Sequence, residues 1–167
     1  MHRSRHHASR YVATLSLVVA ALLLSALQGA FASVVTIDPE GGRHELGTAA
    51  AWLRDAQGIL GIHEIVSSPD FITDDEAPSF GYTTDTVWLK LSLKQERRED
   101  IDWVLDLSPA FLDKIDVYRV EDGNIIDVAA LGDHRPWHDG DWRWRHSAIL
   151  VRLPDNTPAT YLSLIHI

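Results

Sequence analysis

One stretch decides the fold class: VWLKLSL, residues 87–93. A β-strand turns successive side chains to opposite faces, so this alternation places four aliphatic residues on one face of a sheet: Val87, Leu89, Leu91 and Leu93. Trp88 lies on the other face, which predicts either a strand buried on both sides or a sheet surface that faces a ligand. Core packing is the interpretation we favour, because sandwich domains bury their tryptophans.

Further strands are predicted after this stretch, in alternating runs at residues 101–107, 112–121, 125–131, 144–153 and 161–167. A β-branched run at residues 34–37 precedes it, which we interpret as part of a short extended entry. In the run at residues 101–107, Trp103, Leu105 and Leu107 share one face. Asp122-Gly123-Asn124 has the composition of a hairpin turn. Short strands separated by turn residues predict an all-β fold, an antiparallel jelly roll or β-sandwich.

The region before the strands reads differently. Residues 46–60 (LGTAAAWLRDAQGIL) predict a minor N-terminal helix, with Thr48 as its cap and Gly58 at its end. Residues 62–79 lack a sustained period and are rich in Pro, Ser and Asp. We expect them to form an irregular segment across one face of the domain, anchored by Phe71 and Ile72.

The N-terminus has the order of an export signal. Three arginines without an acid precede an apolar run, and Ala30-Phe31-Ala32 forms a small-residue cleavage site. We therefore expect residues 1–32 to be a signal peptide cut after Ala32, followed by an extended lead-in at residues 33–45. An uncleaved anchor helix is the alternative, and the apolar run is short for one. The signal thus predicts a protein that acts outside the cytoplasm.

Composition narrows the function classes. The formal net charge is −9, and removing the three arginines of the signal leaves −12. Such an acidic chain will not bind nucleic acid through a general electrostatic footprint. The absence of cysteine excludes a disulfide framework and a thiol nucleophile. No phosphate-binding loop, nucleophile elbow or zinc-protease motif occurs, so we expect a non-enzymatic domain without a cofactor.

The polar residues concentrate between 133 and 146. Three tryptophans and two arginines there could form a platform for a sugar, together with Trp88: Trp137, Trp142, Trp144, Arg143 and Arg145. His134 and His138 could ligate a metal, although Pro136 between them disfavours the helix that their spacing suits. A third interpretation is structural: a loop leads into an edge strand whose tryptophans pack inward and whose arginines are solvated.

Three blocks of residues, in this order and spacing, resemble a known family. They are SFGYT at 79–83 with the strand at 87–93, residues 103–107 with LDKIDVY at 112–118, and LGDHRP at 131–136 with Arg143, Arg145 and His146 before Leu153-Pro154. Residues 46–161 resemble the type-2 extracellular sensor domain of bacterial seven-transmembrane receptors with diverse intracellular signalling modules. The resemblance implies a jelly roll similar to carbohydrate-binding modules, acting as a periplasmic sensor ahead of membrane helices and a cytoplasmic output module.

The expected function is therefore ligand sensing, with a small molecule such as a carbohydrate as partner. Attachment to the membrane would come only from a region beyond this chain. Two alternatives stay open: a secreted carbohydrate-binding module of a carbohydrate-active enzyme, and a sandwich that binds another protein. Residues 162–167 (LSLIHI) match the translation of a common transposon-end sequencing adapter, which indicates a non-native tail, yet they also suit a strand.

Overall fold

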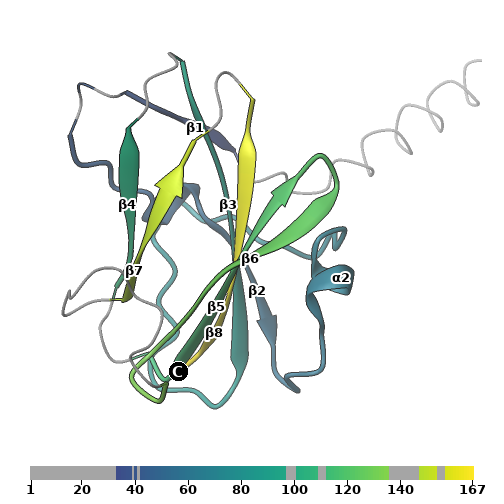
Figure 1. Ribbon diagram of the computed structural model, residues 1–167. Coiled ribbons are helices and arrows are strands. Elements are labelled where there is room, and N and C mark those ends of the chain that lie inside the picture. The colour runs from purple at the N-terminus through teal and green to yellow at the C-terminus, as the bar shows by residue number, and fades with distance from the viewer. Residues whose placement is uncertain are drawn as a thin grey trace, which may run out of the picture.

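A six-stranded sheet forms the centre of the molecule in the computed structural model (Figure 1). The structure describes residues 33–38, 40, 42–96, 101–108, 112–135, 147–153 and 157–167. The main path of the sheet follows the order β1 (Val34–Ile37), β3 (Thr86–Gln95), β8 (Ala159–His166), β5 (Lys114–Glu121) and β6 (Asn124–Leu131). The strand expected from the VWLKLSL stretch is thus β3, extended by one residue before it and two after it.

One edge of β3 is shared by two strands. β1 runs parallel to it and pairs from Ser92 to Gln95, whereas β2 (Ala51–Asp55) runs antiparallel and pairs from Thr86 to Lys90. β8 occupies the other edge over residues 86–93 of β3. β3 therefore has neighbours along both edges.

A second, two-stranded sheet covers one face of the large sheet. It consists of β4 (Asp102–Leu107) and β7 (Ser147–Arg152), which pair antiparallel and lie to one side of the large sheet in Figure 1. The buried residues between the two sheets form the main core: Ile37, Leu91, Leu93, Leu105, Leu112, Ile115, Val117, Ile149, Val151, Leu153, Ala159, Tyr161 and Ile165. Two packed sheets around one core confirm the predicted all-β sandwich.

The opposite face of the large sheet is covered by the chain that follows β2. This cover includes the one-turn helix α2 (Ile62–Ile65) and Phe71. The buried residues of this second core are Ala51, Leu53, Ile65, Phe71, Trp88 and Leu162. Trp88 is only 1% exposed, so β3 is buried on both faces, as the core interpretation of Trp88 requires.

The two predicted anchors of the irregular segment hold it in different ways. Phe71 is buried, which confirms its prediction. The side chain of Ile72 is half exposed, but its backbone exchanges two hydrogen bonds of 2.8 Å with the backbone of Trp52. The segment is therefore fixed to β2 by one side chain in the core and one backbone bridge.

The helix predicted over residues 46–60 is wrong. The structure has a single 3-10 turn, η1 (Gly47–Ala49), and then strand β2. Every second residue of β2 is buried, which is the period of a strand. The strand forms because its backbone pairs with the edge of β3 that β1 leaves free. Gly58, expected to end a helix, instead occupies a turn with φ of +63° after the strand.

The predicted hairpin between residues 121 and 124 is confirmed. Asp122 and Gly123 have φ of +49° and +78°, and Glu121 pairs with Asn124 across them. Two consecutive left-handed residues give a turn whose twist matches that of the flanking strands. The hairpin joins β5 to β6, the outer strand of the path.

Residues 162–166, whose origin we questioned, lie in β8 between β3 and β5. Leu162 is fully buried there. The conformation of these residues does not test whether their codons come from a sequencing adapter. A non-native origin of residues 162–167 therefore stays a prediction. Residues 1–32, with Ala30 and Ala32, lie outside the described residues. Within the described ranges, no helix is long and apolar enough to cross a membrane.

Candidate functional site

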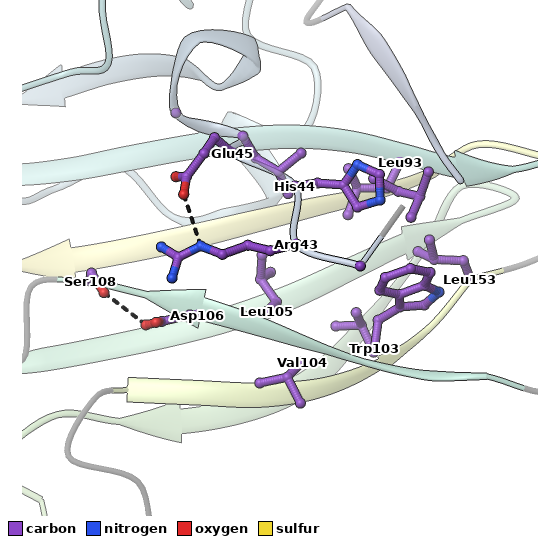
Figure 2. Close-up of a pocket in the computed structure, with 15 residues that line it drawn as sticks. Arg43, His44, Glu45, Leu93, Trp103, Val104, Leu105, Asp106, Ser108 and Leu153 are labelled. Atoms are coloured by element: carbon purple, nitrogen blue, oxygen red, sulfur yellow. Dashed lines mark hydrogen bonds and ion pairs between the residues drawn. The ribbon is translucent and has the colours of Figure 1, made fainter. Parts of the chain in front are cut away.

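A cavity of about 580 Å³ lies between the two sheets, beside the end of β3 (Figure 2). Its walls come from β1, β3, β4 and β7 and from the chain between β1 and η1. The residues that line it are Ile37, Gly42, Arg43, His44, Glu45, Leu46, Gly47, Leu93, Trp103, Val104, Leu105, Asp106, Ser108, Val151 and Leu153. This volume falls in the range typical of small-molecule sites, roughly 300–1,000 Å³.

The inner wall of the cavity is aliphatic. It is formed by Ile37, Leu93, Leu105, Val151 and Leu153, each of which also belongs to the main core. The alternation of each strand turns these side chains inward from four separate segments. The cavity therefore extends inward from the surface into the space between the sheets.

Polar groups gather at the outer side of the cavity. The Arg43 guanidinium donates a hydrogen bond of 2.8 Å to the Glu45 carboxylate, and both side chains are highly exposed. On the opposite wall, the Ser108 hydroxyl donates a hydrogen bond of 2.9 Å to Asp106 (Figure 2). An apolar interior with a polar rim is the usual composition of a ligand pocket.

Trp103 is the aromatic residue of this cavity. Its ring contacts that of His44 edge-on, with centroids 5.7 Å apart, and His44 Nε2 lies 3.1 Å from the Asp38 carbonyl oxygen. The indole Nε1–H of Trp103 is buried, and it has no acceptor among the described residues. A buried donor without a partner is uncommon in proteins and costs about 1–3 kcal/mol.

The segment at residues 42–47 is fixed at its far end by a close contact. A Cβ atom on Gly47 would lie 2.7 Å from Cβ of Ala77. The segments around residues 47 and 77 therefore approach so closely that only glycine fits at position 47 without a shift. η1 starts at Gly47, and its first hydrogen bond runs from Ala49 N–H to the Leu46 carbonyl. The outer wall of the cavity is thereby held against the chain that leads into β3.

The sequence anticipated little of this site. Trp103 was expected to share an inward face with Leu105 and Leu107, which the structure confirms, but it also lines the cavity. No role was foreseen for Arg43 or His44. The sequence signal for these two residues is weak. It is the charged run RHE at 43–45, which lies between Ile37 and Leu46, two residues that pack in or against the main core.

The predicted sugar platform is not placed by the structure. Trp137, Trp142, Trp144, Arg143 and Arg145, and the metal candidate His138, lie outside the described residues, so both roles stay predictions. Trp88, the remaining member of the predicted set, is enclosed by the second core.

His134 lies beside two carboxylates. Its ring and those of Asp113 and Asp133 offer ligand atoms within 4.8 Å of one another, and His134 Nδ1 is 3.6 Å from Asp113 Oδ2. Two oxygen donors and one nitrogen donor could hold a divalent cation. All three groups are at least partly exposed, an arrangement that also occurs without any metal.

Arg135 ties the start of the polar segment to β5. Its guanidinium donates two hydrogen bonds to the Asp116 carboxylate, of 2.6 and 2.8 Å, and both side chains are about one quarter exposed. The hydrogen bond to Asp116 is the main cause that raises the pKa of Arg135 above its usual value. Paired, planar contacts of this kind fix orientation as well as contributing energy.

We expect the Arg135–Asp116 pair to contribute about 1 kcal/mol to folding, because it is bidentate and only partly screened by water. A double-mutant cycle with Arg135→Met, Asp116→Asn and the double variant, measured by urea unfolding, should show that coupling. The exposed pair of Arg152 and Asp102 is the matched control and should give less. Equal coupling energies for the two pairs would contradict the expectation.

A scan against protein-family models matches the 7TMR-DISM extracellular 2 domain over residues 47–166. The chain belongs to this family. The match covers every strand from β2 to β8, and it includes four of the five aliphatic residues of the cavity wall. No curated protein matches the chain. The 7TMR-DISM extracellular 2 family is one of extracellular sensor domains, which agrees with the resemblance found in the sequence and implies an exported protein.

Proposed function

We propose that this protein is the periplasmic ligand-sensing input domain of a membrane signalling receptor. Family membership supports the role of a receptor's extracellular domain. The observation that carries the sensing role is the cavity between the sheets, which has the size, the apolar interior and the polar rim of a small-molecule site. Signal output would come from membrane and cytoplasmic modules of the same receptor.

The location of the cavity suits a sensor. Its walls belong to both sheets: Leu93 and Ile37 to the large one, Trp103 and Val151 to the small one. A ligand held between them contacts both, so its affinity depends on how the sheets are spaced. Two spacings with different affinities are enough for ligand to shift the population between receptor states.

Carbohydrate sensing is the finer part of the proposal, and it rests on the tryptophans and arginines at residues 137–145. Aromatic faces stack on the apolar side of a pyranose, while arginines bond its hydroxyls. We expect a sugar that binds there to raise the melting temperature, and Trp142→Ala and Trp144→Ala to abolish that increase without changing the melting temperature of the free protein by more than about 5 °C. Melting temperatures that no sugar changes would favour a protein–protein sandwich instead.

The receptor assignment is tested in the gene. The reading frame that continues from the codon for residue 161 should encode seven apolar segments, each about 20 residues long, and then a signalling module. Fractionation of cells that carry this gene should place the domain on the periplasmic side of the inner membrane. A downstream glycosidase domain, or recovery of the product as a secreted protein free of membrane, would contradict the receptor assignment.

A further inference from the structure

We infer that the cavity between the sheets binds a neutral, amphipathic small molecule, with an apolar body against the aliphatic wall and a hydrogen-bond acceptor for the indole N–H of Trp103. The inference rests on the proposed sensing function and names the chemical class of ligand that this cavity would take. It differs from the expectation of a sugar, which concerns residues 137–145.

The wall decides the character of the ligand's body. The five inner side chains are aliphatic and offer no partner to a hydroxyl: Ile37, Leu93, Leu105, Val151 and Leu153. Each hydroxyl buried there without a partner costs about 1–3 kcal/mol, and a pyranose carries several. An aromatic or alicyclic body gains free energy over the same surface, at about 25 cal/mol per Å².

The unpaired indole N–H decides the ligand's polar group. Two buried indole N–H groups lack an acceptor in the described part of the chain, those of Trp88 and Trp103. Trp88 is enclosed by the second core, whereas Trp103 lines the cavity. In Figure 2 the nitrogen of Trp103 lies on the side of Leu153, a residue that also lines the cavity. The inference requires the indole to turn so that its buried N–H meets a bound carbonyl or ether oxygen.

The charges around the cavity disfavour an anionic ligand, and the aliphatic wall disfavours a cationic one because it offers no partner to a buried charge. Arg43 is already bonded to Glu45, which leaves the carboxylate of Asp106 as the excess charge of the lining. That carboxylate accepts only the hydrogen bond from Ser108 among those the structure records. An anionic ligand would meet this carboxylate and the acidic chain around it, with a net charge of −9 over the full sequence.

Prodan, 6-propionyl-2-dimethylaminonaphthalene, is a suitable probe, because it is neutral, has an apolar ring system and a carbonyl acceptor, and shifts its emission to the blue in apolar surroundings. The full chain should bind it with a blue shift. Trp103→Phe keeps an aromatic ring at this position but removes the N–H together with part of the indole, so it should weaken binding about tenfold. Trp52→Phe, which changes a partly exposed tryptophan of β2 outside the cavity, should bind prodan as the wild type does.

A second pair of measurements isolates the hydrogen bond. 2-Ethylnaphthalene, which has no acceptor, should displace prodan from the wild type and from Trp103→Phe with affinities within about twofold of each other. Methyl α-glucopyranoside in large excess should displace none. The inference is overturned if the wild type does not bind prodan, if Trp103→Phe binds it as tightly as the wild type, or if the glucoside displaces it.

Failure of this inference can be told apart from failure of the proposed function. A receptor gene together with a sugar that binds and no prodan binding would remove the inference and leave the sensing role intact. Prodan binding in a product without downstream membrane segments would keep the cavity chemistry and remove the receptor role.

Discussion

Gly132→Ala is expected to leave most molecules unfolded under conditions where the wild type is folded. Gly132 has φ of +121°, and a Cβ atom there would lie 2.3 Å from the carbonyl oxygen of Asp113 and 2.7 Å from Cα of Lys114. These are backbone atoms at the start of β5, a strand with neighbours on both edges, so they cannot turn aside. We expect a loss of more than about 3 kcal/mol in the free energy of unfolding, measured with urea.

The same contact explains why this loss should be large. Asp133 N–H and His134 N–H donate hydrogen bonds of 3.1 Å to the carbonyls of Leu112 and Asp113. Relieving the clash would pull the residues after β6 away from β5 and break both bonds. The strain and the lost hydrogen bonds therefore add at one position.

Gly123→Ala is the matched control for Gly132→Ala. Gly123 also has positive φ, +78°, but nothing lies within 4 Å of the place that its Cβ would occupy. Only the conformational penalty applies, about 1 kcal/mol. If the two variants were equally stable, the close approach at Gly132 would not be a feature of the folded protein.

Asp55→Ala should be the second most damaging of the changes considered, with a loss of about 3 kcal/mol in the free energy of unfolding. Asp55 is 5% exposed at the end of β2, and its carboxylate accepts hydrogen bonds from three backbone N–H groups. The donors are Gln57, Gly58 and Leu60, at 3.3, 2.9 and 2.8 Å. Alanine removes both carboxylate oxygens and leaves the N–H groups of Gln57 and Leu60 without this acceptor, whereas the Gly58 N–H keeps only its 3.2 Å hydrogen bond to the Asp55 carbonyl.

Asp55→Asn tests the cause of that loss. It keeps the size and one oxygen acceptor, so its free energy of unfolding should fall between those of the wild type and Asp55→Ala. Asp74→Ala, at an exposed loop position, should change stability by no more than about 0.5 kcal/mol. An Asp55→Ala variant as stable as Asp74→Ala would show that the turn after β2 does not depend on this carboxylate.

The strands were predictable because their apolar residues alternate over enough positions to exclude a helix. β3, β4 and the β5–β6 hairpin lie within a few residues of the predicted bounds. The helix predicted at residues 46–60 was wrong because the alanines there favour a helix, whereas pairing with the edge of β3 determines the conformation of residues 51–55. That edge becomes available only after folding, so no local pattern could reveal it.

The cavity was harder to foresee than the sheets. Its lining comes from five separated parts of the chain, around residues 37, 42–47, 93, 103–108 and 151–153. Each part reads as ordinary core or loop, and only the packing of the small sheet on the large one brings them together. The sequence predicted a ligand site at the clustered tryptophans and arginines of residues 137–145. The described structure indicates one at Trp103, whose neighbours in the cavity are distant in sequence.

The central claim is that a small molecule binds between the two sheets and stabilises the folded domain. The most direct test is a thermal-shift screen of small molecules on the wild type, on Leu105→Trp, which fills the cavity, and on Leu105→Met, which keeps its volume. At about 100 times its Kd, a ligand should raise the melting temperature of the wild type and Leu105→Met by about 5 °C or more and leave Leu105→Trp unchanged. Compounds that stabilise all three proteins alike, or none that stabilises the wild type, would contradict the claim.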